Sequence, residues 1–187
     1  MIPIHTVFGG LLVLFALIGS LRGWAKEMIV AFSVILALFV EHVLLTFVPP
    51  IKVLYDNLPG SSRFYTRAVL FIVITVFGYA SPSVVAQLGA KVARERLQDL
   101  LLGFFLGLIN GFLIVGTLLS FLSAVNFGVP PDQPAGTGGI GGIVPPASDS
   151  PTVGLVGFLP PELIAKSNAA LYIGVAAAFV FVIVVFI

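Results

Sequence analysis

Cysteine is absent from the sequence, and charged side chains and histidines are scarce. Without cysteine the chain can form no disulfide, no thiolate metal site and no cysteine nucleophile. Charged residues make up 9% of the chain, against about 25% in an ordinary soluble domain. Nine basic and eight acidic residues nearly cancel. Because no basic stripe is present either, we expect no nucleic-acid partner.

Long apolar runs replace the missing charge, and hydrophobic residues make up 59% of the chain. A helix of about 20 residues crosses roughly 30 Å of hydrocarbon, so each run is long enough to span a bilayer. The runs are residues 2–21, 28–48, 68–88, 100–125 and 169–187. We therefore expect an all-α fold, a polytopic membrane helix bundle of four transmembrane helices plus a fifth at the C-terminus, with the lipid bilayer as its surroundings.

The first run is expected to remain in the membrane. A signal peptide carries positive charge before its apolar stretch and a small-residue cleavage site after it. Here the first positively charged side chain, Arg22, follows the apolar stretch. The run is therefore predicted to be a retained membrane helix.

Composition divides the chain into three parts. Residues 1–125 form a four-helix membrane domain, residues 126–168 are rich in proline and glycine, and residues 169–187 form the C-terminal transmembrane helix. The middle part has too few apolar residues for a packed core and is predicted to be a flexible loop, with an option for one short membrane-touching piece around residues 153–159. Its glycines lack the following Gly-Lys-Ser/Thr of a phosphate-binding loop.

A small polar turn separates the first two runs. Arg22 would lie at the negative end of the first helix dipole and Glu27 at the positive end of the second, and both signs are favourable. Gly23 suits a helix stop, and Trp24 is typical of the headgroup level. Lys26 can keep its stem in the apolar layer while its charge reaches water. A functional turn and a plain solvated turn both fit this pattern.

Glu41 interrupts the second run about 10 Å from its end. An ionised carboxylate at that depth is costly unless it is paired or faces the bundle interior. Either the buried part of the helix ends near Val40, or Glu41 is neutralised. Arg67, at the start of the third run, would lie on the same side of the membrane, and we hypothesise an intramembrane ion pair between Glu41 and Arg67.

The connecting segments allow several readings. Pro49-Pro50 should stop the second helix, and residues 51–66 look like an interfacial loop. Ser81-Pro82 favours either a kink in the third helix or the start of a new one. Residues 91–99 hold the densest charge cluster in the chain, and both a surface helix and a solvated turn fit it.

Gly103, Gly107 and Gly111 recur at intervals of four in the last of the four runs. This spacing places them on one helix face, where a neighbouring backbone can approach closely. Asn110 beside them could hydrogen-bond to another helix. The stripe predicts helix contact and no particular function.

Two of these stretches resemble the colicin V production protein family. The turn Arg22-Gly23-Trp24-Ala25-Lys26-Glu27 is similar to the family's Arg-Gly-aromatic-x-basic-Glu turn, and residues 97–111 are similar to its glycine-spaced last helix. The resemblance covers about residues 4–125. It implies a non-enzymatic, multi-pass protein of the bacterial inner membrane, serving production or secretion of a toxin. Asn110 departs from the family, which often has arginine before the glycine, so a role for charge at this position is in question.

Orientation follows from the basic residues. With five crossings, one side of the membrane receives Arg22, Lys26, Lys91, Arg94 and Arg96, and the other receives Lys52, Arg63, Arg67 and Lys166. The positive-inside rule favours the first group, with the charged hairpin turns, in the cytoplasm.

No catalytic motif is present. The chain lacks His-Glu-x-x-His and Gly-x-Ser-x-Gly, and its two histidines, His5 and His42, lie in different runs. We therefore expect no enzyme, no cofactor and no metal. Two alternatives to the role implied by the family stay open: a small transporter or channel subunit lined by Glu41, Arg67 and Asn110, and a scaffold that binds a cytoplasmic partner. Self-association or contact with another membrane protein is expected in each case.

Overall fold

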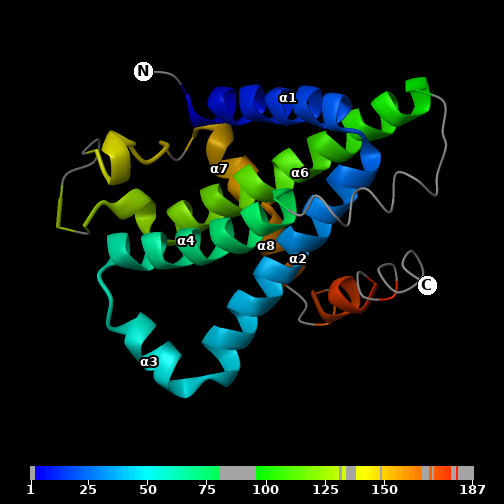
Figure 1. The fold of residues 1–187 in the computed structure, drawn as a ribbon. Helices are drawn as coiled ribbons and strands as arrows, with labels where there is room; N and C mark the ends of the chain where they lie inside the picture. Colours follow the sequence, from blue (N-terminus) through cyan, green and yellow to red (C-terminus); the bar gives the residue numbers. More distant parts are fainter. Residues whose placement is uncertain are drawn as a thin grey trace.

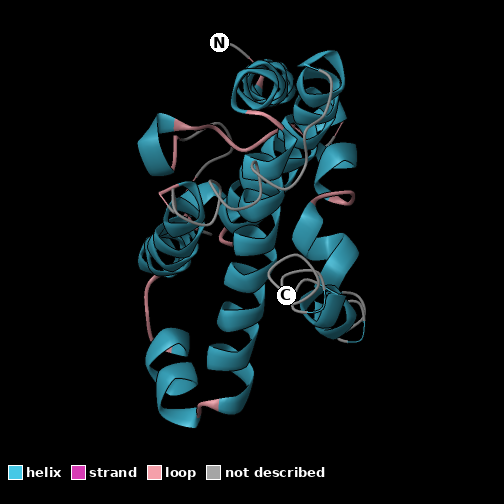
Figure 2. Ribbon diagram, turned by 45° about the vertical axis from the view of Figure 1, so that its right-hand side comes forward, coloured by secondary structure: helices cyan, strands magenta, loops and turns pink. Residues whose placement is uncertain are grey.

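The described part of the chain is helical throughout its regular elements. The computed structural model describes residues 3–80, 96–130, 132–133, 138–147, 149–165, 169, 171–177 and 180. Within these residues no strand occurs, and helices are joined by short loops (Figure 2). The helices are α1 (Ile4–Arg22), α2 (Trp24–Phe47), α3 (Pro49–Asp56), α4 (Gly60–Tyr79), α6 (Arg96–Ala124), η1 (Asn126–Gly128), η2 (Ile140–Gly142), α7 (Pro151–Val156) and α8 (Pro160–Ala165). The all-α prediction is confirmed.

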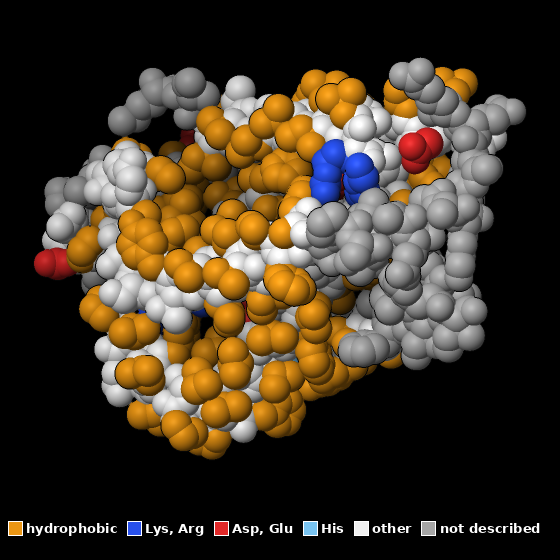
Figure 3. Space-filling view, in the orientation of Figure 1, with side chains coloured by type: hydrophobic (Ala, Val, Ile, Leu, Met, Phe, Trp, Pro, Cys, Tyr) orange, Lys and Arg blue, Asp and Glu red, His pale blue; other side chains and the backbone are white. Residues whose placement is uncertain are grey.

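Four helices, α1, α2, α4 and α6, are long and apolar enough to cross a membrane. They contain or overlap the first four apolar runs, so the prediction of four spans is confirmed. Their exposed large apolar side chains include Val13, Leu17, Val73, Phe77 and Phe105. Hydrophobic atoms also dominate the face of the molecule seen in Figure 3. Such a surface is suited to contact with lipid chains.

The fifth predicted crossing is not found among the described residues. Residues 171–177 are helical, and Leu171 is buried against the bundle. Much of the last apolar run, including residues 181–187, lies outside the described residues. The described portion is too short to qualify as a span.

The glycine stripe of α6 packs against α1 of the same chain. The two helices run side by side in opposite directions (Figure 1) and form the largest contact between helices of the described residues. A Cβ on Gly19 would clash with the Gly103 carbonyl oxygen and lie 2.6 Å from Gly107 Cα. A Cβ on Gly111 would lie 2.7 Å from Phe15 Cβ. The stripe therefore serves contact between two helices of the same chain.

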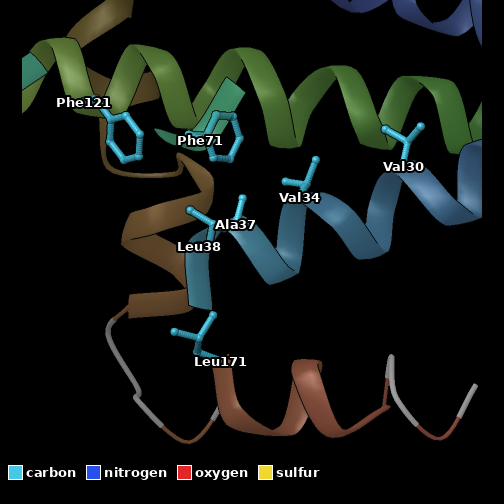
Figure 4. Packing of buried hydrophobic residues seen from close by; sticks show 7 residues of the cluster. All are labelled: Val30, Val34, Ala37, Leu38, Phe71, Phe121 and Leu171. Carbon is cyan, nitrogen blue, oxygen red and sulfur yellow. The ribbon is translucent and has the colours of Figure 1, made fainter. Parts of the chain in front are cut away.

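A dry apolar core lies where α2, α4 and α6 meet. Val34 and Ala37 of α2 are fully buried against Phe71 of α4 and Phe121 of α6 (Figure 4). The two rings meet edge to face, with centroids 5.8 Å apart. This arrangement favours aromatic pairs beyond the area they bury. The core fixes the position of α2, on which both buried glutamates lie.

The interfacial loop expected at residues 51–66 is mostly helix. Pro49 and Pro50 end α2 but also begin α3, because proline suits the first turn of a helix, where its missing N–H is not needed. The next helix, α4, begins at Gly60. The Arg63 side chain reaches back and donates from Nε to the Leu58 carbonyl oxygen at 2.9 Å. The prolines were interpreted as a stop alone, and their second role as a helix start was missed.

The segment predicted as a flexible loop, 126–168, contains four short helices in its described residues. Ser150 caps α7 by accepting a hydrogen bond from the Thr152 N–H at 3.3 Å, and Pro151 occupies the first turn. Leu159 is fully buried in a cluster with Phe127 and with Phe8 of α1. The segment packs because its apolar side chains contact α1 and α6. Its own composition could not supply a core without these two helices.

Candidate functional site

The turn between α1 and α2 is a single residue, Gly23. Its φ of +86° lies in the region that favours glycine. A Cβ at this position would lie 2.8 Å from an Asp99 carboxylate oxygen. The same carboxylate accepts a hydrogen bond from the Trp24 backbone N–H at 3.1 Å. Asp99 of α6 thus satisfies a free donor at the start of α2, which that helix cannot satisfy itself.

Glu27, in the first turn of α2, is buried and held through both carboxylate oxygens. Its side chain is 1% exposed, and its Oε1 lies 2.8 Å from Arg22 Nη1. Its Oε2 accepts a hydrogen bond from Asn110 Nδ2 at 2.8 Å. The same Nδ2 donates to the Glu27 backbone carbonyl at 2.8 Å. The carboxylate therefore has the paired, hydrogen-bonded surroundings that a buried charge needs.

Tyr79, at the end of α4, completes this group. The Arg22 guanidinium carbon lies 4.3 Å from the centre of the Tyr79 ring, which is a cation–π contact. Residues from α1, α2, α4 and α6 thus converge on one point. We call Arg22, Glu27, Tyr79, Asp99 and Asn110 the turn cluster.

A second buried ion pair lies toward the other end of α2. Arg67 of α4 donates from Nε to Glu41 Oε1, and the Glu41 side chain is 7% exposed. The Arg67 guanidinium carbon lies 4.0 Å from the centre of the Phe121 ring. Within the protein, Glu41 is therefore buried and paired. The alternative in which the membrane-buried part of α2 ends near Val40 concerns the position of the bilayer and stays a prediction.

The two ion pairs share one design. In each, a glutamate of α2 pairs with an arginine that also covers an aromatic ring, Tyr79 in one and Phe121 in the other. Glu27 and Glu41 are about 21 Å apart along the helix. The apolar core of Figure 4 lies between them. The described residues thus form two separate polar sites and no continuous polar channel.

A lateral groove reaches the turn cluster from the lipid-facing side. It has a volume of about 330 Å³ and lies between α1, α4 and α6, with Tyr79 and Thr75 in its wall. The buried Thr75 hydroxyl has no hydrogen-bond partner among the described residues. The groove is almost wholly apolar, because the Thr75 hydroxyl is buried behind its wall, and Tyr79 links this wall to Arg22.

The other predicted site residues lie apart from these pairs. Lys26 is exposed, and no ion pair to it occurs within the described part of the chain. His5 Nδ1 lies 3.2 Å from Thr152 Oγ1, and His42 Nε2 lies 3.5 Å from the Tyr172 hydroxyl. Among described residues no group of three or more histidine, aspartate or glutamate side chains is suited to a metal ion.

Some predictions fall on residues that are not described. The choice between a kink and a new helix at Ser81-Pro82 lies outside the described residues, as do Lys91, Arg94 and Glu95 of the charge cluster. Asp99, at the end of that cluster, lies in the first turn of α6.

Sequence reasoning missed the roles of Asp99 and Tyr79. Asp99 was counted among the residues of a surface cluster, although aspartate is a common partner for free N–H groups at a helix start. Tyr79 gave a weak signal, because it lies in the middle of the predicted run 68–88. Asn110 was noticed, but its partner on α2 could not be named from the sequence.

The two ion pairs, the turn and the glycine stripe all lie in one region of the sequence. Residues 4–135 match the sequence model of the family described as Colicin V production protein. The chain belongs to that family. The match covers well over half of the 187 residues, including every span of the described structure. No curated protein and no solved structure matches the chain. This member of the colicin V production family is a multi-pass membrane protein by its four spans.

Proposed function

We propose that this colicin V production family member acts without catalysis of its own in the production or secretion of a toxin peptide. The family's description supports the toxin-related role. The turn cluster is the candidate functional site, because it joins four helices around the buried carboxylate of Glu27.

The observation that carries this proposal is the burial of Glu27 inside the spanning bundle. Its side chain is 1% exposed and depends on partners from two other helices. Ionisable residues within membrane spans are costly and commonly mark functional sites. In proteins, replacing a buried ion pair by apolar residues of similar volume is often neutral or stabilising. The burial of Glu27 is therefore better explained by a role in function than by a contribution to stability.

Secretion by cells that make the toxin tests the proposal. Glu27→Gln keeps the shape of the side chain and removes its charge. We expect secreted toxin activity to fall about tenfold or more, equivalent to roughly 1.4 kcal/mol, while the amount of protein in the membrane stays unchanged. Lys26→Gln is the matched control, since it removes one charge from the same turn at an exposed position. Equal secretion by wild type and Glu27→Gln at equal membrane levels would overturn the proposal.

A small transporter or channel subunit is the second candidate, and the Glu41–Arg67 pair buried between α2 and α4 favours it. Buried charges paired across helices are typical of solute and proton pathways. Flux of a tracer solute into proteoliposomes that is lost in Glu41→Gln would support this candidate. The apolar core between the two ion pairs must then open during transport, so a static pore is not part of the proposal.

Fewer features of the structure support the third candidate, a scaffold that binds a cytoplasmic partner. Arg22 is engaged inside the molecule, which leaves the exposed Lys26 as the charge that the turn offers to a partner. Loss of a co-purifying chain in Lys26→Ala, with insertion unchanged, would favour this alternative over the other two.

The setting we propose is the bacterial inner membrane, with the α1–α2 turn in the cytoplasm. The excess of basic residues on that side supports this orientation by the positive-inside rule. The last apolar run serves as a fifth crossing, as its uncharged sequence favours. Self-association, or contact with another membrane protein, would use a face other than the glycine stripe, because α1 already covers the stripe.

A further inference from the structure

A large apolar cavity lies at the other end of α1, away from the turn cluster. Its volume is about 690 Å³, within the roughly 300–1,000 Å³ of small-molecule sites. One wall is the first half of α1, a second is the last part of α6, and the segment 142–146 lies over them. In the view of Figure 3 the surface is hollowed below α1. The residues that line the cavity include Val7, Val115, Leu118, Ile143, Ser150 and Thr152.

The cavity is continuous with the lipid-facing surface. Val7 lines it and is 48% exposed, so the cavity is open beside this residue. Ile143, on the opposite wall, is 37% exposed. Both α1 and α6 are long and apolar enough to span a membrane, and Val7 lies in the first turn of α1. The opening beside Val7 therefore lies near the membrane surface, within reach of the acyl chains of neighbouring lipids.

Polar groups gather beside one end of the cavity. Thr152 is 1% exposed, and its hydroxyl lies 3.2 Å from His5 Nδ1 in the first turn of α1. Ser150 lies next to it and accepts the Thr152 N–H. The first turn of a span lies close to the membrane surface, where the polar part of a lipid resides. The cavity thus has an apolar interior with hydroxyl and imidazole groups beside the start of α1.

We propose that this cavity binds one acyl chain of a membrane phospholipid, whose polar end lies beside His5, Ser150 and Thr152. Water fills polar cavities and leaves apolar ones, which instead take apolar molecules. The proposal goes beyond the toxin-related function and does not depend on it, since the cavity shares no residue with the turn cluster.

Photo-labelling in vesicles tests this inference on the full chain. The probe is phosphatidylcholine with a diazirine in one acyl chain, used as a minor component of phosphatidylglycerol vesicles. After illumination, the labelled residues are mapped by mass spectrometry. We expect labelling of Val115 and Leu118 in excess over the exposed face of α1 near Val13, because a bound chain stays longer than bulk lipid.

Two substitutions sharpen the test. Leu118→Trp fills the cavity and should abolish the excess labelling, while Val13→Trp adds the same bulk at a position 58% exposed on α1 and should leave it unchanged. Val115→Phe is a milder filling variant if Leu118→Trp does not fold. Uniform labelling of cavity and exposed face in the wild type would overturn the inference. So would cavity labelling by a diazirine-bearing apolar peptide with none by the lipid.

Discussion

Arg22 and Glu27 share an ion pair but not the same surroundings. The Arg22 side chain is 23% exposed and can turn its charge toward water, whereas that of Glu27 is 1% exposed. Removing either partner leaves the other unpaired, and the penalty depends on how deeply that residue is buried. The pair should therefore respond unequally to substitution.

We expect Arg22→Met to cost about 3–5 kcal/mol of folding free energy, because it leaves the buried Glu27 carboxylate without its ion-pair partner. Glu27→Gln should cost clearly less, since the amide can still bond with Asn110 and Arg22 can reach water. Thermal unfolding in mild detergent measures both. Equal losses of stability in the two variants would contradict the inequality of burial.

Gly23 is a second residue whose identity the geometry requires. An alanine there would adopt a strained φ, at about 1–3 kcal/mol, and would crowd the Asp99 carboxylate. We expect Gly23→Ala to lower the melting temperature in detergent. Gly10→Ala is the control, because a Cβ on Gly10 meets nothing within 4 Å. Equal melting temperatures for the two variants would argue against a rigid joint.

At the scale of elements, α1 is held chiefly by close contact with α6. Gly19 faces Gly103 and Gly107 with no side chain between the backbones. Such contacts gain dispersion energy and do not depend on water, which suits a helix pair in lipid.

Gly107→Leu should therefore push α1 away from α6 and destabilise the fold. We expect the variant to insert into the membrane, because its hydrophobicity increases, but to lose resistance to protease at the α1–α2 turn. Ile109→Leu, at a position 49% exposed on the same helix, serves as the control. Unchanged protease resistance in Gly107→Leu would mean that α1 is held by other contacts.

The sequence predicts which long helices are present better than it predicts the residues at which they begin and end. Long uncharged runs identify α1, α2, α4 and α6, because lipid requires some 20 apolar residues for each span. Polar residues at the ends of a run give no such signal, so the first turns of α2 and α4 were assigned to loops. Pro49 and Pro50 were interpreted as a break, and α3 was missed.

At the scale of the whole molecule, much of the exposed surface is apolar, and two ion pairs, Arg22–Glu27 and Glu41–Arg67, lie inside the bundle. We expect the protein to stay with the membrane fraction after washes with high salt or alkaline carbonate, and to require detergent for release. Recovery as a folded, monodisperse protein without detergent would contradict a membrane bundle.

The pairing of distant residues was the least predictable feature. Glu41 and Arg67 could be matched because Glu41 lies near the end of one run and Arg67 at the start of the next, on the same side of the membrane. Asn110 and Glu27 are 83 residues apart, and their contact depends on the register between α6 and the hairpin. That register is set by backbone contacts such as the one between Gly19 and Gly107. The number of apolar residues in a run does not predict such contacts.

The hydrogen bond from Trp24 to Asp99 also bears on how the protein is made. The ribosome delivers the first two spans long before the residue that closes their joint, and Asn110 follows later still. Until then the hairpin lies in the bilayer with Glu27 paired to Arg22 but not to Asn110, and with the Trp24 N–H without its Asp99 acceptor. Newly made chains should therefore pass through a fragile stage, open to membrane proteases, that ends when the last of the four spans arrives.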